Sequence, residues 1–192
     1  KKLTGEYGFC QTYFDDARIP ADCMLGQEGE GWSVAMKTLM FERGAVGGQA
    51  GGLSMMDLNI NDIIELARRA TRNGRPAIDD PLTRDELIKL VLEARGNALM
   101  GSKAKIPALN QTYPTAVAMS SKLRGSELKR KMTRFALSLQ GANGARYISE
   151  QAMDGGKWQR SYLNSFSATI GGGTSQIQKN ILGERVLGLP KS

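Results

Sequence analysis

The chain contains no histidine, and this absence removes every mechanism that relies on an imidazole base or an imidazole metal ligand. It contains two cysteines, Cys10 and Cys23, which are too few for a four-cysteine zinc site or a disulfide framework. Two ordinary thiols favour a reduced, cytoplasmic compartment. No apolar run approaches the roughly 18 residues that a membrane span needs. We therefore expect neither a metal nor a membrane span.

Aromatic residues make up only 6% of the chain, although its net charge is +7. Positive charge is typical of proteins that meet nucleic acids, membrane surfaces or anionic metabolites. Because little aromatic surface is available for base stacking, we expect no nucleic-acid partner. A steep salt dependence of DNA or RNA affinity would instead favour a basic helical nucleic-acid binder.

Apolar residues at helical spacing predict several long helices. The first covers residues 31–69 and contains five closely spaced glycines, which indicate a close approach by a neighbouring helix or a ligand. The second begins near Thr83, which forms a capping box with Glu86, and fades near Pro107. The third begins after Pro114 and ends at a glycine-rich turn. Its apolar stripe consists of Leu128, Met132, Phe135 and Leu139, and its outer face of Lys122, Arg124, Lys129, Arg130, Lys131 and Arg134.

The two ends of the chain differ in character. Residues 1–26 alternate with period two around Tyr7, Phe9 and Tyr13, which predicts an extended segment that must pack against something else. Residues 157–170 predict a shorter helix, and Thr174 predicts the cap of a last helix. Together these features predict an all-α fold, an up-and-down four-helix bundle with a short extended N-terminal segment.

Two features offer candidate chemistry. Three consecutive glycines lead into Thr174 and the last helix, where free N–H groups suit an anion, although no lysine precedes Thr174 as a phosphate loop requires. Glu42 and Arg43 lie inside an apolar helical stretch. A desolvated carboxylate there would have a raised pKa and could act as a base. The alternatives are a capped linker at the glycines and an ion-paired glutamate on a polar face.

Three segments of the chain resemble the acyl-CoA dehydrogenase family. Residues 14–32 look like the exit from that family's middle β-domain, residues 39–43 like its first long C-terminal helix, and residues 173–190 like its C-terminal signature. The resemblance implies that residues 1–26 are a remnant of the middle β-domain and that residues 27–192 are the C-terminal helical bundle domain. It implies FAD as cofactor, an acyl-CoA thioester as substrate and a place in fatty acid metabolism. The isolated chain is expected to be inactive.

The resemblance also implies site residues. Many members carry the catalytic base two residues before the threonine of the signature, where this chain has Gly172; a second group carries it immediately before an arginine of the first helix, which makes Glu42 the base and Arg43 a substrate contact here. Gly173, Thr174 and Gln176 match positions that contact FAD. Gly141, Asn143 and Gly144 match a turn that contacts FAD from the partner subunit.

The chain departs from the family at two other cofactor positions. Ser138 stands where a glutamine is usual, and the Arg-x-x-Phe-Gly contact is replaced by a longer connection from Arg72 to Pro81. The family implies a homodimer or homotetramer formed through the bundle. We therefore predict an FAD-dependent acyl-CoA dehydrogenase that removes a proton from Cα and a hydride from Cβ of the thioester. The alternative is a non-catalytic assembly subunit of a heteromeric acyl-CoA dehydrogenase.

Overall fold

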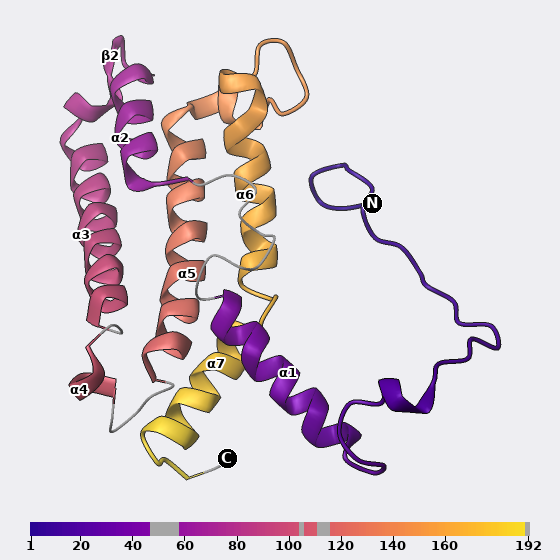
Figure 1. The fold of residues 1–192 in the computed structure, drawn as a ribbon. Coiled ribbons are helices and arrows are strands. Elements are labelled where there is room, and N and C mark those ends of the chain that lie inside the picture. Colours follow the sequence, from indigo (N-terminus) through magenta and orange to yellow (C-terminus); the bar gives the residue numbers. More distant parts are fainter. Residues whose placement is uncertain (47–57, 104–105, 111–115, 191–192) are drawn as a thin grey trace.

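The computed structural model describes residues 1–46, 58–103, 106–110 and 116–190, with the backbone alone for residues 40–46, 109–110 and 116–119. Four helices stand side by side and alternate in direction along the chain (Figure 1). This arrangement confirms the predicted all-α bundle. The four helices are α2 (Ile60–Arg69), α3 (Pro81–Lys103), α5 (Ala116–Leu139) and α6 (Lys157–Ala168).

Helix α5 lies at the centre of the bundle and packs against α2, α3 and α6. The predicted apolar stripe of α5 is confirmed, because all four of its residues are buried. Each such side chain contributes about 1.5–3 kcal/mol when it leaves water. The core that they share with the other helices comprises Ile63, Leu66, Ala67, Ala70, Ala77, Leu87, Leu90, Leu128, Met132, Phe135, Ala136, Leu139 and Trp158.

The predicted first helix is divided. Helix α1 (Gly31–Val46) packs against α5, and α2 begins after Asn59, whose side chain accepts hydrogen bonds from the N–H groups of Asn61 and Asp62 in a capping box. Gly44 lies in the described backbone of α1. The remaining glycines of that stretch, Gly47, Gly48, Gly51 and Gly52, lie outside the described residues.

A short hairpin connects α2 to α3. Strands β1 (Thr71–Arg72) and β2 (Arg75–Pro76) pair antiparallel, and Asn73 and Gly74 between them both have positive φ, as a tight hairpin turn requires. After the 3₁₀ turn η2 (Ala77–Asp79), α3 begins with a proline, whose missing N–H costs nothing at the first helical position.

The predicted capping box of Thr83 and Glu86 is wrong, because α3 begins three residues before its expected start. Asp80 is the cap: its Oδ2 accepts hydrogen bonds from the Thr83 N–H at 2.9 Å and from the Thr83 hydroxyl at 2.7 Å. These two bonds, the hydroxyl first, hold the pKa of the Asp80 carboxyl below its ordinary value. Asp80 is therefore the N-cap residue of α3, and Thr83 donates hydrogen bonds to it.

Replacing Asp80 by alanine is expected to lower the melting temperature by about 2–4 °C, because the Thr83 N–H in the first turn of α3 loses its acceptor. Asp79→Ala is the matched control, since no hydrogen bond or ion pair is found for its exposed carboxylate among the described residues. Because the folded pKa of Asp80 is depressed, its contribution is present above the unfolded pKa of about 4 and is lost as the pH falls through the folded value. Equal melting temperatures for the two variants at neutral pH would contradict the cap.

Short elements occupy the two ends of the bundle. The hairpin, the 3₁₀ turn η3 (Gly141–Ala145) and the 3₁₀ turn η4 (Met153–Gly156) lie at one end, and α4 (Pro107–Asn110) and α7 (Ser175–Ile181) lie at the other (Figure 1). A π-helical turn, η5 (Leu182–Val186), follows α7. The predicted helices at residues 157–170 and after Thr174 are thereby confirmed, apart from small shifts of their ends.

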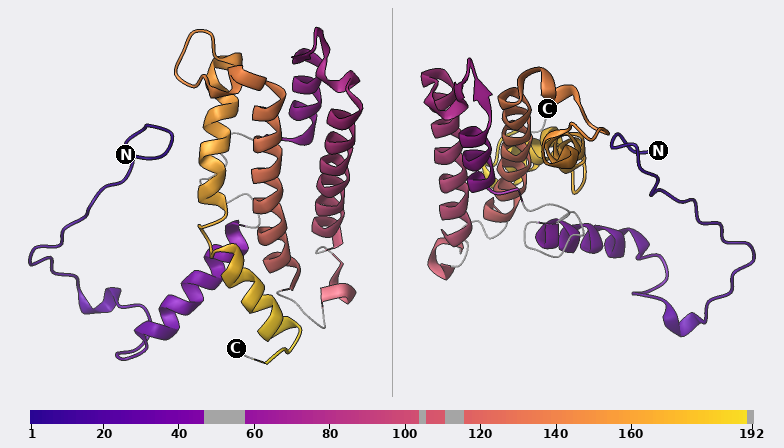
Figure 2. Two further views of the ribbon diagram at one scale, coloured as in Figure 1. Left: turned by 180° about the vertical axis from the view of Figure 1, so that it is seen from behind. Right: turned by 90° about the horizontal axis from the view of Figure 1, so that it is seen from above.

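Residues 1–30 form an extended arm that leads away from the bundle (Figure 2). The arm pairs with no strand among the described residues, and its only helical element is the 3₁₀ turn η1 (Ala21–Cys23). Its first turn touches the end of the bundle, where the Tyr147 hydroxyl donates to the Thr4 carbonyl at 2.9 Å. Tyr7, Phe9 and Tyr13 are exposed. Whether the arm belongs to a β-domain, with a boundary at residue 26, stays a prediction.

Candidate functional site

A glycine turn (residues 171–174) connects α6 to α7 and contains the predicted cofactor residues Gly173 and Thr174. Gly172 and Gly173 adopt φ of 68° and 101°, in the left-handed region that favours glycine. Thr174 caps α7 as predicted, since its hydroxyl accepts from the Ile177 N–H at 3.2 Å. Gln176 is exposed on α7. The turn thus brings all three predicted cofactor residues of the signature to one end of the bundle.

A lysine in the first turns of α5 supports the glycine turn, and the predicted exposed position of this lysine is wrong. Lys122 does not lie on the exposed face of its helix but is buried, and its ammonium donates to the carbonyl oxygen of Gly173. Burial lowers the pKa of Lys122, and the charge of Glu127 partly opposes that effect. Glu127 itself accepts a hydrogen bond from the Ser175 hydroxyl at 2.5 Å. Helical spacing could not reveal these contacts, because they join segments about 50 residues apart.

Gln178 supports the same turn from α7. Its side chain is 1% exposed, and its Nε2 donates to the Gly172 carbonyl at 2.7 Å. A Cβ atom at Gly173 would lie 2.8 Å from this nitrogen, and the φ of 101° at Gly173 would strain any residue that carries a side chain. The Oε1 atom of Gln178 is buried and has no partner among the described residues. Neither Lys122 nor Gln178 is predicted as a site residue by its sequence pattern.

The second predicted cofactor set lies at the opposite end of the bundle. Gly141 begins η3 with φ of 55°, and a Cβ atom at Gly144 would lie 2.8 Å from the Leu137 carbonyl. Gln159 of α6 holds this turn, since its Nε2 donates to the Gly144 carbonyl at 3.1 Å and to Gln140 Oε1 at 3.2 Å. The N–H of Asn143 donates to the Gln140 carbonyl. This second turn is therefore fixed by buried amides.

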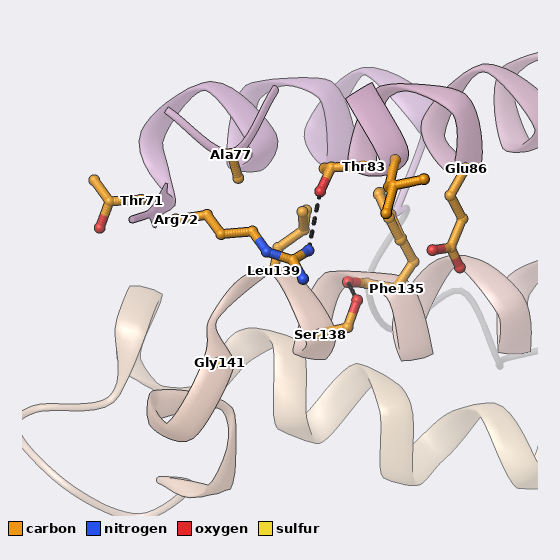
Figure 3. Close-up of a pocket in the computed structure, with 10 residues that line it drawn as sticks. Thr71, Arg72, Ala77, Thr83, Glu86, Phe135, Ser138, Leu139 and Gly141 are labelled. Carbon is orange, nitrogen blue, oxygen red and sulfur yellow. Dashed lines mark hydrogen bonds between the residues drawn. The ribbon is translucent and has the colours of Figure 1, made fainter. Parts of the chain in front are cut away.

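A cavity of about 420 Å³ opens between the hairpin, the start of α3 and the end of α5. Figure 3 shows the Arg72 side chain extending into it beside Thr83 and Ser138, with Gly141 at its edge. Arg72 Nη1 donates to the Thr83 hydroxyl at 3.3 Å and lies 3.7 Å from Asp80 Oδ2. The volume is typical of small-molecule sites. The connection from Arg72 to Pro81, which differs from the family pattern, and the turn at Gly141 thus line the same cavity.

Helix α1 carries the predicted base. The backbone of Glu42 and Arg43 lies in the last turns of α1, and their side chains lie outside the described part of the chain. Helix α1 packs against α5 and meets the bundle at the end where α7 begins (Figures 1 and 2). The structure therefore brings the backbone of the predicted base to the end that holds the glycine turn.

The two cofactor sets are far apart within one chain. Lys122, beneath the first set, and Gly141, in the second, are separated by most of α5, roughly 28 Å at the rise of an α-helix. The described residues bring together no group of three His, Cys, Asp or Glu side chains that could hold a metal. No helix of this part of the chain is long and apolar enough to cross a membrane.

Comparison with known proteins gives consistent matches. The family model described as "Acyl-CoA dehydrogenase, C-terminal domain" matches residues 29–187. The curated protein "Acyl-CoA dehydrogenase IpdE1" of Mycolicibacterium smegmatis is 37% identical over 193 residues, which cover 99% of this chain and 45% of IpdE1. The chain therefore spans less than half of the length of that relative.

Solved structures share the fold. The ChsE4–ChsE5 complex from Mycobacterium tuberculosis matches with a TM-score of 0.71 and 24% identity, covering 94% of this chain and 46% of that chain. Butyryl-CoA dehydrogenase from Megasphaera elsdenii also matches with a TM-score of 0.71 and 24% identity, covering 91% of this chain and 43% of that chain. At this identity the likeness concerns the fold of the helical bundle.

Proposed function

The chain belongs to the acyl-CoA dehydrogenase family, as its C-terminal helical domain, and we propose that it serves in an enzyme that dehydrogenates an acyl-CoA thioester with FAD as hydride acceptor. The observation that carries this proposal is the supported glycine turn at the α7 end of the bundle. That turn contains Gly173 and Thr174, and it lies at the end where α1 brings Glu42.

The residues at the glycine turn fit a flavin cofactor. The turn has no side chain at Gly172 or Gly173, and a Cβ atom at Gly173 would lie 2.8 Å from Gln178 Nε2. The N–H groups of Gly173 and Thr174 have no hydrogen-bond partner among the described residues. When bound, the flavin supplies the acceptor for the hydride that leaves Cβ. Gly173, Thr174 and Gln176 would hold it from this chain.

The second cofactor set is proposed to serve the flavin of a partner subunit. Gly141, Asn143 and Gly144 lie roughly 28 Å along α5 from the first set, so one chain does not bring the two sets to one spot. In a homodimer or homotetramer, the first set of each chain would contact the flavin of that chain, and the second set would contact the flavin of a neighbouring subunit. The cavity beside Gly141 offers the cationic side chain of Arg72 to such a partner's cofactor.

Glu42 is proposed as the base that takes the α-proton of the thioester. Gly172 cannot supply a carboxylate, and its φ of 68° would strain a glutamate at that position. Arg43 is proposed to contact the substrate. Proton abstraction by a positioned carboxylate requires the pKa of that carboxylate to approach the working pH. The proposed compartment is the cytoplasm.

The first test uses the full-length protein that contains this chain. The full-length protein is expected to purify with a yellow flavin. Anaerobic addition of the correct acyl-CoA is expected to bleach the visible flavin band. Screening thioesters of different chain length and branching identifies the substrate class. A protein that is saturated with FAD and is bleached by no acyl-CoA would contradict the proposed activity.

One observation favours a second candidate, a non-catalytic subunit of a heteromeric enzyme. The ChsE4–ChsE5 structure, which matches 94% of this chain, is a complex of two differently named proteins. In such an assembly the bundle would serve as an interface, and Glu42 would take no part in the reaction. Co-purification with a second, different acyl-CoA dehydrogenase chain would support this candidate, and the Glu42 variant discussed below separates the two.

A further inference from the structure

Two successive carbonyl groups of the glycine turn are held from the protein side. Gln178 Nε2 donates to the Gly172 carbonyl at 2.7 Å, and the Lys122 ammonium donates to the Gly173 carbonyl. Both donor side chains are buried, at 1% and 7% exposure. The donors come from different helices: Gln178 lies six residues further along the chain on α7, and Lys122 reaches the turn from α5, 51 residues away in the sequence.

This arrangement sets the direction of two N–H groups. No described peptide bond is cis, and in a trans peptide the C=O and N–H groups point in opposite directions. The N–H of Gly173 shares a peptide plane with the Gly172 carbonyl, and the N–H of Thr174 shares one with the Gly173 carbonyl. The Gly173 N–H therefore points away from the Gln178 amide, and the Thr174 N–H points away from the Lys122 ammonium. Neither has a hydrogen-bond partner among the described residues.

We propose that Lys122 and Gln178 are positioning residues that turn the N–H groups of Gly173 and Thr174 outward as a prearranged pair of donors for the bound flavin. The inference rests on the proposed function, because it assigns the pair to the flavin of that same site. Neither residue contacts the cofactor in this assignment. Each acts through the backbone of the turn, and Glu127 completes the support by accepting from the Ser175 hydroxyl beside it.

The burial of Lys122 argues for such a role. Removing an ammonium group from water is costly, and an apolar side chain would be tolerated more easily at a position that only filled space. The nearby carboxylate of Glu127 partly compensates the charge. The ammonium finds its hydrogen-bond acceptor in the Gly173 carbonyl, so its position fixes the orientation of one particular peptide plane. Donors fixed before the ligand arrives bind it without a further ordering cost.

The test compares three variants of the full-length protein. Lys122→Met removes the donor and keeps most of the stem, Lys122→Arg keeps a cation, and Gln178→Leu removes the second donor independently. Lys131→Met is the matched control, because Lys131 lies on the same helix but is exposed and pairs with Glu93 at 2.8 Å.

Two readouts are measured. In flavin-free protein, amide exchange of Ile177 and Gln178, whose N–H groups bond to Thr174, is expected to accelerate about tenfold in Lys122→Met and Gln178→Leu. In the same two variants the dissociation constant for FAD is expected to rise about tenfold, with a changed visible flavin spectrum. Lys122→Arg keeps a cation, so its amide exchange and its dissociation constant for FAD are expected to stay close to those of the unchanged protein. Lys131→Met is expected to change neither quantity.

The outcomes distinguish this inference from the proposed function. Unchanged exchange and unchanged FAD affinity in both Lys122→Met and Gln178→Leu would overturn the inference even if the enzyme dehydrogenates acyl-CoA. Faster exchange with unchanged FAD affinity would also overturn it, because the two residues would then support only the fold. A full-length protein that binds no FAD at all would contradict the proposed function, while the exchange readout would still report on the turn.

Discussion

Replacing Glu42 by glutamine is expected to lower the kcat of the full-length enzyme by about 10²–10⁴-fold, because the amide cannot accept the α-proton of the thioester. The flavin content is expected to stay unchanged, since the residues proposed to hold the flavin lie on other elements. Anaerobic stopped-flow measurement of flavin bleaching gives the rate of the chemical step directly. It separates a lost base from slow release of product.

Glu65→Gln is the matched control for this variant. Glu65 lies on α2, and its carboxylate forms an exposed ion pair with Arg68, in which both side chains are 59% exposed. Such pairs contribute little to stability, so this variant is expected to retain full turnover. If Glu42→Gln bleaches as fast as the unchanged enzyme, the base assignment fails. An active assembly in which Glu42 is dispensable would then favour the non-catalytic subunit.

The bundle could be predicted from the sequence because its signals are local or periodic. The stripe of α5 repeats at helical spacing, so Leu128 and Phe135 had to share a face, and a face of four large apolar residues must be buried. Thr174 could be recognised as a cap because the capping hydroxyl and the N–H group that donates to it lie three residues apart. Information of this kind lies within a few residues of the chain.

The supports of the candidate site could not be predicted in the same way. Lys122 stands in a run of basic residues whose composition indicates a solvated face, and only the packing of α7 against α5 shows that it is buried. Asp80 was missed because Thr83 is also a common cap, and the choice between them depends on where the helix begins. The glycine pattern pointed to the turn but not to the side chains that hold it.

Trp158 on helix α6 is the residue of the core whose loss is expected to destabilise the bundle strongly. Trp158 is 1% exposed and packs in the core, and its indole Nε1 donates to Asp154 Oδ2 at 2.7 Å. Trp158→Ala is expected to lower the free energy of unfolding by about 3–5 kcal/mol, because a large cavity replaces the indole. Urea unfolding followed by far-ultraviolet circular dichroism measures the change. Leu92→Ala is the control, since Leu92 is 66% exposed on α3 and its loss is expected to cost little.

Trp158→Phe separates packing from hydrogen bonding at this position. The phenyl ring fills most of the space, so this variant is expected to recover more than half of the stability that alanine loses. Asp154 keeps its contact with Arg69, whose hydrogen bond is the main reason that the pKa of Asp154 lies below its ordinary value. The stabilisation by Asp154 is therefore present above an unfolded pKa of about 4 and disappears as the pH falls through the folded value. If Trp158→Phe were as unstable as Trp158→Ala at neutral pH, the indole N–H bond and not the packing would account for the role of this residue.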